Sequence, residues 1–257
     1  MLTLLAVLLT LAEPVGFMMP PSAVIIDEER VAVSWNDGDS FRFLEGKFQR
    51  QQVRLMGYNA LESYGPVHSW PKWTAFELFK VTKNATRFAR SHVWHCAWDG
   101  KKDHYGRMLV YCADLTEAMI REGYGHVYAI QPPVDEKLLK AQREAIRAKR
   151  GMWARGVPDG LMTSLHSVNE QGGGKGKTYD RVISTSTGLS KEYRHESTYA
   201  TCEEVCRDGS CLVYVPFELR YGPDRAQCLR TRDLWPREVK SPADAVDAGE
   251  TPRVKPR

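Results

Sequence analysis

Four short polar segments stand out, at 36–40, 53–57, 59–62 and 103–107. Taken singly, each has an ordinary explanation: Asp37-Gly38-Asp39 is typical of a turn, and Arg54 is typical of a strand residue that faces water. Taken together, they offer two kinds of chemical group. Carboxylate and carbonyl oxygens suit a hard cation such as Ca²⁺, and arginine holds a phosphate through two parallel N–H donors.

The segments between these residues indicate the elements that position them. Alternating apolar residues, glycine turns and helical spacing predict strands at 31–35, 40–44 and 52–56, a helix at 73–90, a hairpin of 93–98 and 108–112, and helices at 116–123 and 135–150. Asp99-Gly100 is expected to turn the hairpin, and Thr116 and Asp135 are expected to cap the last two helices. This order predicts an α+β domain with a small barrel.

In this order and spacing, five motifs resemble the staphylococcal nuclease (thermonuclease) family. They are Asp37-Gly38-Asp39-Ser40, Val53-Arg54-Leu55-Met56-Gly57, Asn59-Ala60-Leu61-Glu62, Asp103-His104-Tyr105-Gly106-Arg107 and Arg150-Gly151-Met152-Trp153. The resemblance runs from about Val31 to Trp153, roughly half of the chain. It implies an OB-type five-stranded β-barrel with three helices, followed here by a small Cys-rich segment.

The resemblance also implies phosphodiester hydrolysis of DNA and RNA with one Ca²⁺ ion. Asp39, Asn59 and the backbone carbonyl of Ala60 are then the expected metal ligands. Asp37 is expected to lie close by and to influence the metal without being a ligand itself. Glu62 is expected to orient or deprotonate the attacking water, and Arg54 and Arg107 are expected to hold the phosphate. The nucleotide is expected to lie against Tyr105 and Tyr128, although ordinary core packing is an alternative for Tyr128.

Two positions depart from the family pattern. Asn59 stands where the family has an aspartate, which removes one negative charge, and Leu61 stands where it has proline. Fewer charged ligands predict weaker Ca²⁺ binding. The loop after Glu62 is also short, which predicts a more open substrate mouth.

Six cysteines are present, and four of them fall within the C-terminal part at a C-x3-C-x4-C-x16-C spacing. Disulfides are the favoured interpretation for these four, with zinc or free thiols as alternatives. Among three connectivities, we favour Cys206–Cys211 with Cys202–Cys228, because Asp208-Gly209 lies between the first two. If the hairpin pairs as the resemblance implies, Cys96 and Cys112 face one another and form a third disulfide.

Composition divides the 257 residues into five parts. They are a signal peptide or N-terminal hydrophobic segment (1–24), the nuclease-like domain (25–160), a Gly-rich linker (161–177), a Cys-rich C-terminal segment (178–236) and a disordered tail (237–257). No basic residue precedes the apolar run Leu2–Ala12, yet its length and the cysteines favour a secreted or periplasmic protein. No apolar run reaches the length of a membrane span, and the net charge of +4 is too small to identify a partner by itself.

These observations support a metal-dependent nuclease with little sequence specificity. The alternative is a catalytically weak domain that binds nucleic acid, or a surface interaction module whose Cys-rich segment binds a protein. Asn59 favours the alternative, whereas Arg54, Glu62 and Arg107 favour the enzyme.

Overall fold

The structure is a computed structural model that describes residues 22–63, 65–171 and 178–230. Six strands close a barrel in the order β1-β2-β3-β4-β8-β7, with bounds β1 (Ala23–Ile26), β2 (Glu29–Trp35), β3 (Ser40–Phe43), β4 (Gln52–Leu55), β7 (Trp94–Lys102) and β8 (Met108–Tyr111). The pairs β1–β7 and β4–β8 are parallel, and the others are antiparallel. The α+β class and the OB-type barrel are therefore confirmed.

The barrel has one strand more than the five expected. The extra strand is β1, whose apolar residues were assigned partly to the N-terminal hydrophobic segment. It pairs with β2 through a turn at Asp27 and Glu28, both of which have positive φ values. The remainder of that segment, 1–21, lies outside the described residues, as does the predicted tail.

Alternating side chains of the strands fill the barrel interior. Phe41 and Phe43 of β3, Val53 of β4, and Met108 and Val110 of β8 are all fully buried. Because side chains point to opposite faces at successive strand positions, the same strands leave the intervening residues outside. Arg54 is one of these, which places it on the outer face of β4 between two buried neighbours.

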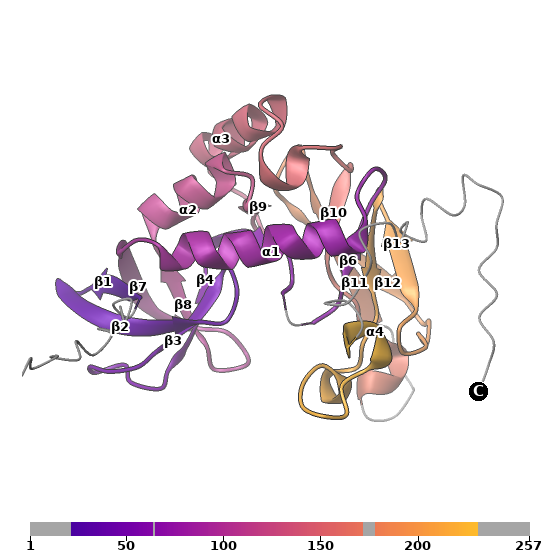
Figure 1. Ribbon diagram of the computed structural model, residues 1–257, viewed down its shortest axis with the longest axis horizontal. Coiled ribbons are helices and arrows are strands. Elements are labelled where there is room, and N and C mark those ends of the chain that lie inside the picture. The colour runs from indigo at the N-terminus through magenta and orange to yellow at the C-terminus, as the bar shows by residue number, and fades with distance from the viewer. Residues whose placement is uncertain (1–21, 64, 172–177, 231–257) are drawn as a thin grey trace, which may run out of the picture.

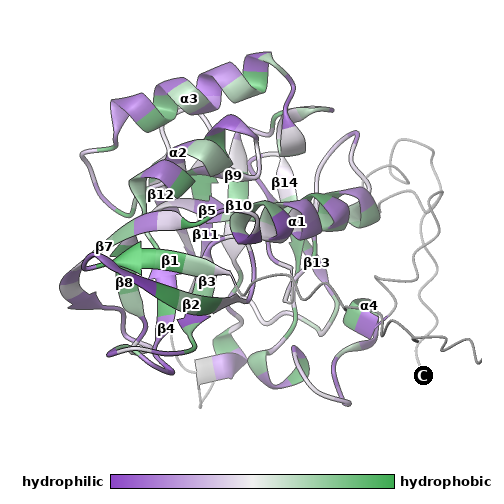
Figure 2. Ribbon diagram, turned by 60° about the vertical axis from the view of Figure 1, so that its left-hand side comes forward, coloured by the Kyte–Doolittle hydropathy of each residue, from purple (hydrophilic) through white to green (hydrophobic). Residues whose placement is uncertain are grey.

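Three long helices accompany the barrel, as predicted: α1 (Ala75–Arg90), α2 (Ala113–Arg121) and α3 (Glu136–Arg147). α1 and α2 contact barrel strands, and α3 packs on α2. Asp135 caps α3, as expected, by accepting the backbone N–H of Lys137 at 2.8 Å. The prediction that Thr116 caps α2 is wrong, because α2 begins one turn earlier and buries that side chain. Figure 2 shows hydrophilic and hydrophobic residues alternating along α3, as in a helix with one face on the core.

The turn of the β7–β8 hairpin also differs from expectation. Strand β7 continues through Asp99-Gly100, where the register shifts, and ends at Lys102. The chain reverses instead at Asp103, whose Oδ1 accepts the backbone N–H groups of Tyr105 at 3.0 Å and Arg107 at 2.9 Å. A side chain that closes its own turn in this way outweighs the local Asp-Gly signal.

The C-terminal module, residues 160–171 and 178–230, has short helical turns and the strands of two small sheets, the second of which also includes β6 from the N-terminal half. One sheet has the order β10-β11-β12, and the other β13-β14-β6. Their bounds are β10 (Gly160–Ser164), β11 (Thr178–Ser184), β12 (Ser190–His195), β13 (Glu204–Arg207), β14 (Ser210–Val213) and β6 (His68–Ser69), and the helices are η2 (Val168–Gln171), η3 (Phe217–Leu219) and α4 (Gln227–Arg230).

The predicted linker at 161–177 is wrong over its first part. Strand β10 starts at Gly160 and pairs with β11, and Leu161 and Met162 are buried. These apolar residues pack within the sheet, so this part of the predicted linker is a buried strand. Residues 172–177, which hold the glycine run, lie outside the described part.

The module is joined directly to the nuclease-like half of the chain. Leu212 of β14 pairs with His68 of β6, and the Val213 N–H donates to the carbonyl of Val67 at 2.9 Å. Figure 1 shows the barrel strands and the orange C-terminal strands at opposite ends of α1. Within the described residues, no helix has the length and apolar character that a membrane crossing requires.

The three predicted disulfides are present. Cys96–Cys112 ties β7 to the N-cap position of α2 with a Cα separation of 4.0 Å. In the C-terminal module, Cys202–Cys228 and Cys206–Cys211 have Cα separations of 5.8 and 3.9 Å. Zinc and free thiols are therefore excluded for these four residues.

Candidate active site

The turn between β2 and β3 carries the first two acidic side chains. Asp37 Oδ1 accepts the backbone N–H of Asp39 at 3.2 Å and the hydroxyl of Ser40 at 2.6 Å. A Cβ on Gly38 would lie 2.9 Å from Cβ of Ala60, so only glycine allows this turn to pack so closely. The turn thereby presses Asp39 against β5 (Gly57–Ala60).

Asp39 is the centre of a buried polar network and is only 2% exposed. Its Oδ1 accepts from Nη1 of Arg54, and its Oδ2 accepts the backbone N–H of Ala60 at 2.6 Å. Nη2 of Arg54 donates to Oδ1 of Asn59, and Nδ2 of Asn59 donates to the Ala60 carbonyl at 2.7 Å. The three expected metal ligands are thus brought together, and Arg54 is the cation that two of them face.

Negative charge exceeds what Arg54 balances. Burial raises the pKa of Asp39 to about 8, an effect that the Arg54 guanidinium opposes and the Asp37 and Glu62 carboxylates reinforce. Burial alone would lower the pKa of Arg54, but Asp39, Asp37 and Glu62 raise it instead. Three carboxyl groups therefore act on one partly buried arginine.

Glu62 follows β5 and lies half-buried at the edge of this network. Burial raises the pKa of its carboxyl group, helped by Asp37 and opposed by Arg54, Arg220 and Arg107. In the part of the chain that the structure describes, no hydrogen bond engages the Glu62 carboxylate, so it is available to accept a proton.

His68 holds the backbone of Glu62. Nε2 of His68 accepts the Glu62 N–H at 3.1 Å, which places the ring proton on Nδ1. Burial lowers the pKa of His68 to about 3, and the nearby His126 adds to this, so the ring is neutral. Between Glu62, His68 and Thr82 lies a hollow of about 10 Å³, the size of one water.

Arg107 approaches Glu62 from the turn between β7 and β8. Its Nε donates to Oδ2 of Asp103 at 2.7 Å, which holds the guanidinium against the turn. The positive charge of Arg107 opposes the rise in the pKa of Glu62. The ring centre of Tyr105 lies 5.6 Å from Cζ of Arg107, and this ring is 71% exposed. An exposed ring beside an arginine suits contact with a nucleotide, as expected for Tyr105.

Tyr128 lies on the other side of the network. It ends β9 (Gly125–Tyr128), where it pairs with Gly57 of β5, and its hydroxyl contributes to the raised pKa of Arg54. It is half-buried rather than part of the core. All the predicted site residues thus lie around one network, with the two tyrosines at its margins.

The donor set fits a hard cation. Asp39, Asn59 and the Ala60 carbonyl supply oxygen atoms, which Ca²⁺ prefers, and the surrounding carboxylates provide unbalanced negative charge. Arg54 already binds two of these oxygens, and only one ligand side chain is a carboxylate. Both facts predict weak metal binding.

Sequence reasoning missed Arg220, Tyr221 and the role of His68. The three lie outside every motif, and the first two reach the site from the C-terminal module. A Cβ on Gly65 would lie 3.5 Å from Oε2 of Glu62 and 3.9 Å from Cδ of Arg220. The loop after Glu62 is therefore bordered by the C-terminal module instead of being open, as its short length had suggested.

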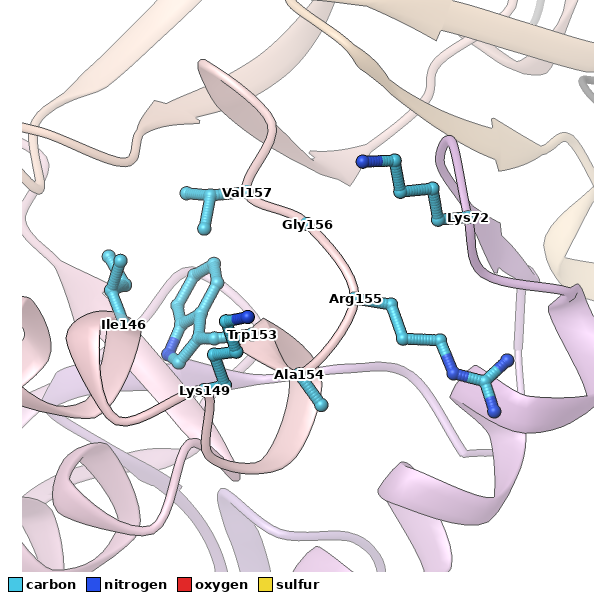
Figure 3. A pocket seen from close by; sticks show the side chains of 8 residues that line it. All are labelled: Lys72, Ile146, Lys149, Trp153, Ala154, Arg155, Gly156 and Val157. Carbon is cyan, nitrogen blue, oxygen red and sulfur yellow. The ribbon is translucent and has the colours of Figure 1, made fainter.

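Two other features carry no part of this site. A hollow of about 510 Å³ lies beside Trp153, where Lys72, Lys149 and Arg155 are among the lining residues and Arg155 also pairs with Glu77 at 2.5 Å (Figure 3). None of the predicted site residues lines it. Glu204 lies near two cysteine sulfurs at spacing suited to a metal, but Cys206 and Cys211 are joined as a disulfide.

Comparison with known proteins agrees with this geometry. Residues 52–155 match the family model described as staphylococcal nuclease homologue, which covers the chain from β4 to just beyond η1 (Gly151–Trp153). A search of curated proteins finds no match to this chain. The match therefore identifies a staphylococcal nuclease homologue domain at residues 52–155.

Proposed function

We propose that the protein is a metal-dependent nuclease that hydrolyses phosphodiester bonds of DNA and RNA with little sequence specificity. The observation that carries this proposal is the convergence of Arg54, Arg107 and Glu62 on a buried acidic network. A phosphodiester is anionic and gains negative charge as it reacts, so it needs fixed positive donors together with a base.

The residues divide the reaction between them. The Glu62 carboxylate accepts a proton from the attacking water, whose oxygen bonds to phosphorus as the bond to the leaving sugar oxygen breaks. Arg54 and Arg107 donate to the non-bridging phosphate oxygens, and Arg107 also supports the leaving oxygen. The raised pKa of Glu62 suits a base that works near neutral pH.

Asp39, Asn59 and the Ala60 carbonyl would hold Ca²⁺, and Asp37 would orient Asp39 through the turn that both share. When bound, the ion supplies positive charge that polarises the phosphate and makes water more acidic. The contacts of Asp39 and Asn59 support this assignment, because both side chains already face a cation, Arg54.

Cleavage assays separate the enzyme from the alternative functions. Supercoiled plasmid and unstructured RNA are incubated with the full chain in Ca²⁺ or in EDTA, and Glu62→Gln is compared with wild type. Glu136→Gln is the matched control, because that side chain is 81% exposed on α3. We expect Ca²⁺-dependent cleavage of both polymers, lost in Glu62→Gln and kept in the control.

Binding without cleavage by the wild-type protein would favour a nucleic-acid-binding module. Neither binding nor cleavage would favour the protein interaction module.

We further propose that the protein is secreted or periplasmic. Three disulfides support this, because such bonds persist in oxidising compartments and are rare in the cytosol. Expression of the full chain in an exporting bacterial host, followed by fractionation and intact mass measurement, tests it. An unprocessed chain that stays in the cytosol with free thiols would contradict the proposal.

A further inference from the structure

The segment after β14 turns back toward the catalytic residues. It contains η3, Arg220 and Tyr221, and it is anchored on both sides. The Arg220 Nε donates to the Val215 carbonyl at 2.9 Å, and the N–H of Ala226 donates to the carbonyl of Leu219 at 2.9 Å. With β14 paired to β6, these bonds fix Arg220 near the loop of Glu62.

Arg220 adds a third cation to the catalytic carboxylate. Its Cδ and Oε2 of Glu62 both lie within 4 Å of the Cβ position of Gly65. Its charge lowers the pKa of Glu62 in the same direction as Arg107. Among the described residues, the hydrogen bond to Val215 is the one that engages its guanidinium, so the Nη groups are available to an anion.

Two aromatic rings accompany this arginine. Phe217 is 65% exposed and Tyr221 is 56% exposed, and their ring centres are 5.9 Å apart in an edge-on arrangement. Tyr221 follows Arg220 directly in the chain. Burial and the negative charges of Glu62 and Asp37 raise the pKa of its hydroxyl, and Arg220 and Arg107 oppose this shift. Exposed rings next to cationic groups form the stacking surfaces that bind unpaired bases.

We propose that Arg220, Phe217 and Tyr221 form an additional nucleotide subsite that the C-terminal module contributes to the active site. Its ligand is an unpaired nucleotide of the same polynucleotide strand, next to the scissile phosphodiester. Arg220 binds the phosphate of this nucleotide, and the aromatic pair stacks on its base. The proposal rests on the nuclease function, but it concerns residues outside the matched family region.

Fluorescence anisotropy tests the subsite directly. Labelled octathymidylate and dithymidylate are titrated with full-length protein in Ca²⁺, using a Glu62→Gln background to prevent cleavage. Arg220→Ala, Tyr221→Ala and Phe217→Ala are the test variants. The matched controls are Arg194→Ala, whose side chain is 71% exposed on β12, and Tyr111→Ala, which is 37% exposed on β8.

For octathymidylate we expect each aromatic variant to weaken binding about tenfold, since base stacking on one ring typically contributes ~1–3 kcal/mol. Arg220→Ala should also weaken it and should reduce the slope of log K against log salt by about 0.7, the value for one phosphate on a single strand. Dithymidylate, which is too short to fill the subsite, should lose much less affinity in all three variants.

Unchanged octathymidylate affinity and salt slope in Arg220→Ala and Tyr221→Ala would overturn the subsite. If Arg220→Ala and Tyr221→Ala, made separately with Glu62 intact, still cleave polynucleotides at the wild-type rate, the nuclease function stands without the subsite. If wild-type protein cleaves no polynucleotide, the proposed function itself fails. Because Phe217 and Tyr221 are exposed, their truncation leaves the fold intact, and thermal unfolding checks this for Arg220→Ala.

Discussion

Two buried aspartates, one in each half of the molecule, have similar hydrogen-bond partners but different surroundings. Asp180 of β11 is 0% exposed and accepts from Arg207 Nε at 2.7 Å, from the Tyr199 hydroxyl at 2.8 Å and from His195 Nε2 at 3.1 Å. The Ser197 N–H donates to the other ring nitrogen, which leaves the proton on Nε2. Every one of these partners is a donor.

Asp39 is buried to nearly the same extent, yet its surroundings are not balanced. It shares Arg54 with Asn59 and lies beside the carboxylates of Asp37 and Glu62. A buried carboxylate matched by donors stabilises a fold, whereas one placed among other carboxylates creates a field suited to an added cation. The difference indicates that the Asp39 region is organised for binding and the Asp180 region for structure.

The largest expected effect is on activity and lies at the Asp39 region. Arg107→Ala should lower kcat ~10²–10³-fold, equivalent to about 2.7–4 kcal/mol, because one donor to the transition state is lost. The ion pair with Asp103 is partly exposed, so the free energy of unfolding should fall by at most about 1 kcal/mol. Single-turnover kinetics and urea unfolding measure both; wild-type cleavage in Arg107→Ala would refute the catalytic assignment.

At the other aspartate we expect the reverse pattern. Asp180→Asn should lower the free energy of unfolding by about 3 kcal/mol, because it leaves Arg207 without its charged partner and disturbs three hydrogen bonds. The rate per folded molecule should stay unchanged. Asp224→Asn, at an exposed position of the same module, is the control. Intact stability with lost turnover would show that the Asp180 region takes part in catalysis.

His68 connects the two regions, because β6 pairs with β14 while the ring holds Glu62. Its pKa is lowered from 6.5 to about 3, so between these values the unfolded chain binds a proton that the folded chain does not. Stability is therefore fully present above pH 6.5 and decreases as the pH falls toward 3.

His68→Gln should remove about 2 kcal/mol of the stability difference between pH 7 and pH 5, at about 1.4 kcal/mol per pH unit below 6.5. Urea unfolding at several pH values measures it. His95→Gln, whose side chain is 72% exposed, should keep the wild-type slope. An unchanged slope in His68→Gln would mean that this ring is protonated in the folded protein.

The smallest expected effect tests the excess of negative charge around Asp39. Asn59→Asp adds a carboxylate to the predicted ligand set with almost no change in volume, and it should tighten Ca²⁺ binding roughly tenfold, or about 1.4 kcal/mol. Calorimetry and a Ca²⁺ titration of cleavage would show it. Weaker or unchanged affinity would mean that Asn59 is not a ligand, or that the lost hydrogen bond to the Ala60 carbonyl matters more.

The features that could be predicted from the sequence are those that depend on local residue patterns or on motifs in a fixed order. Alternation of buried and exposed residues gives the strands that hold Arg54, and the capping aspartate at 135 gives the start of α3. The prediction of a turn at Asp99-Gly100 is wrong. A two-residue pattern cannot show that the Asp103 side chain accepts backbone hydrogen bonds within the turn that follows it.

The contribution of the C-terminal module could not be predicted from the sequence. Strand β6 has two residues, too few for any period, and its pairing with β14 depends on packing between distant parts of the chain. Arg220 and Tyr221 approach Glu62 only through that pairing. They therefore have no sequence signal that distinguishes them from ordinary surface residues.

The β6–β14 pairing also has a consequence for biosynthesis. Residues 68–69 emerge from the ribosome long before residues 210–213, so the barrel can form while β6 still has no neighbour. Pairing of such sequence-distant segments is slow compared with local folding. We therefore expect the loop that carries Glu62 to be completed last, and a chain released before residue 210 to keep its barrel while the proposed active site stays latent.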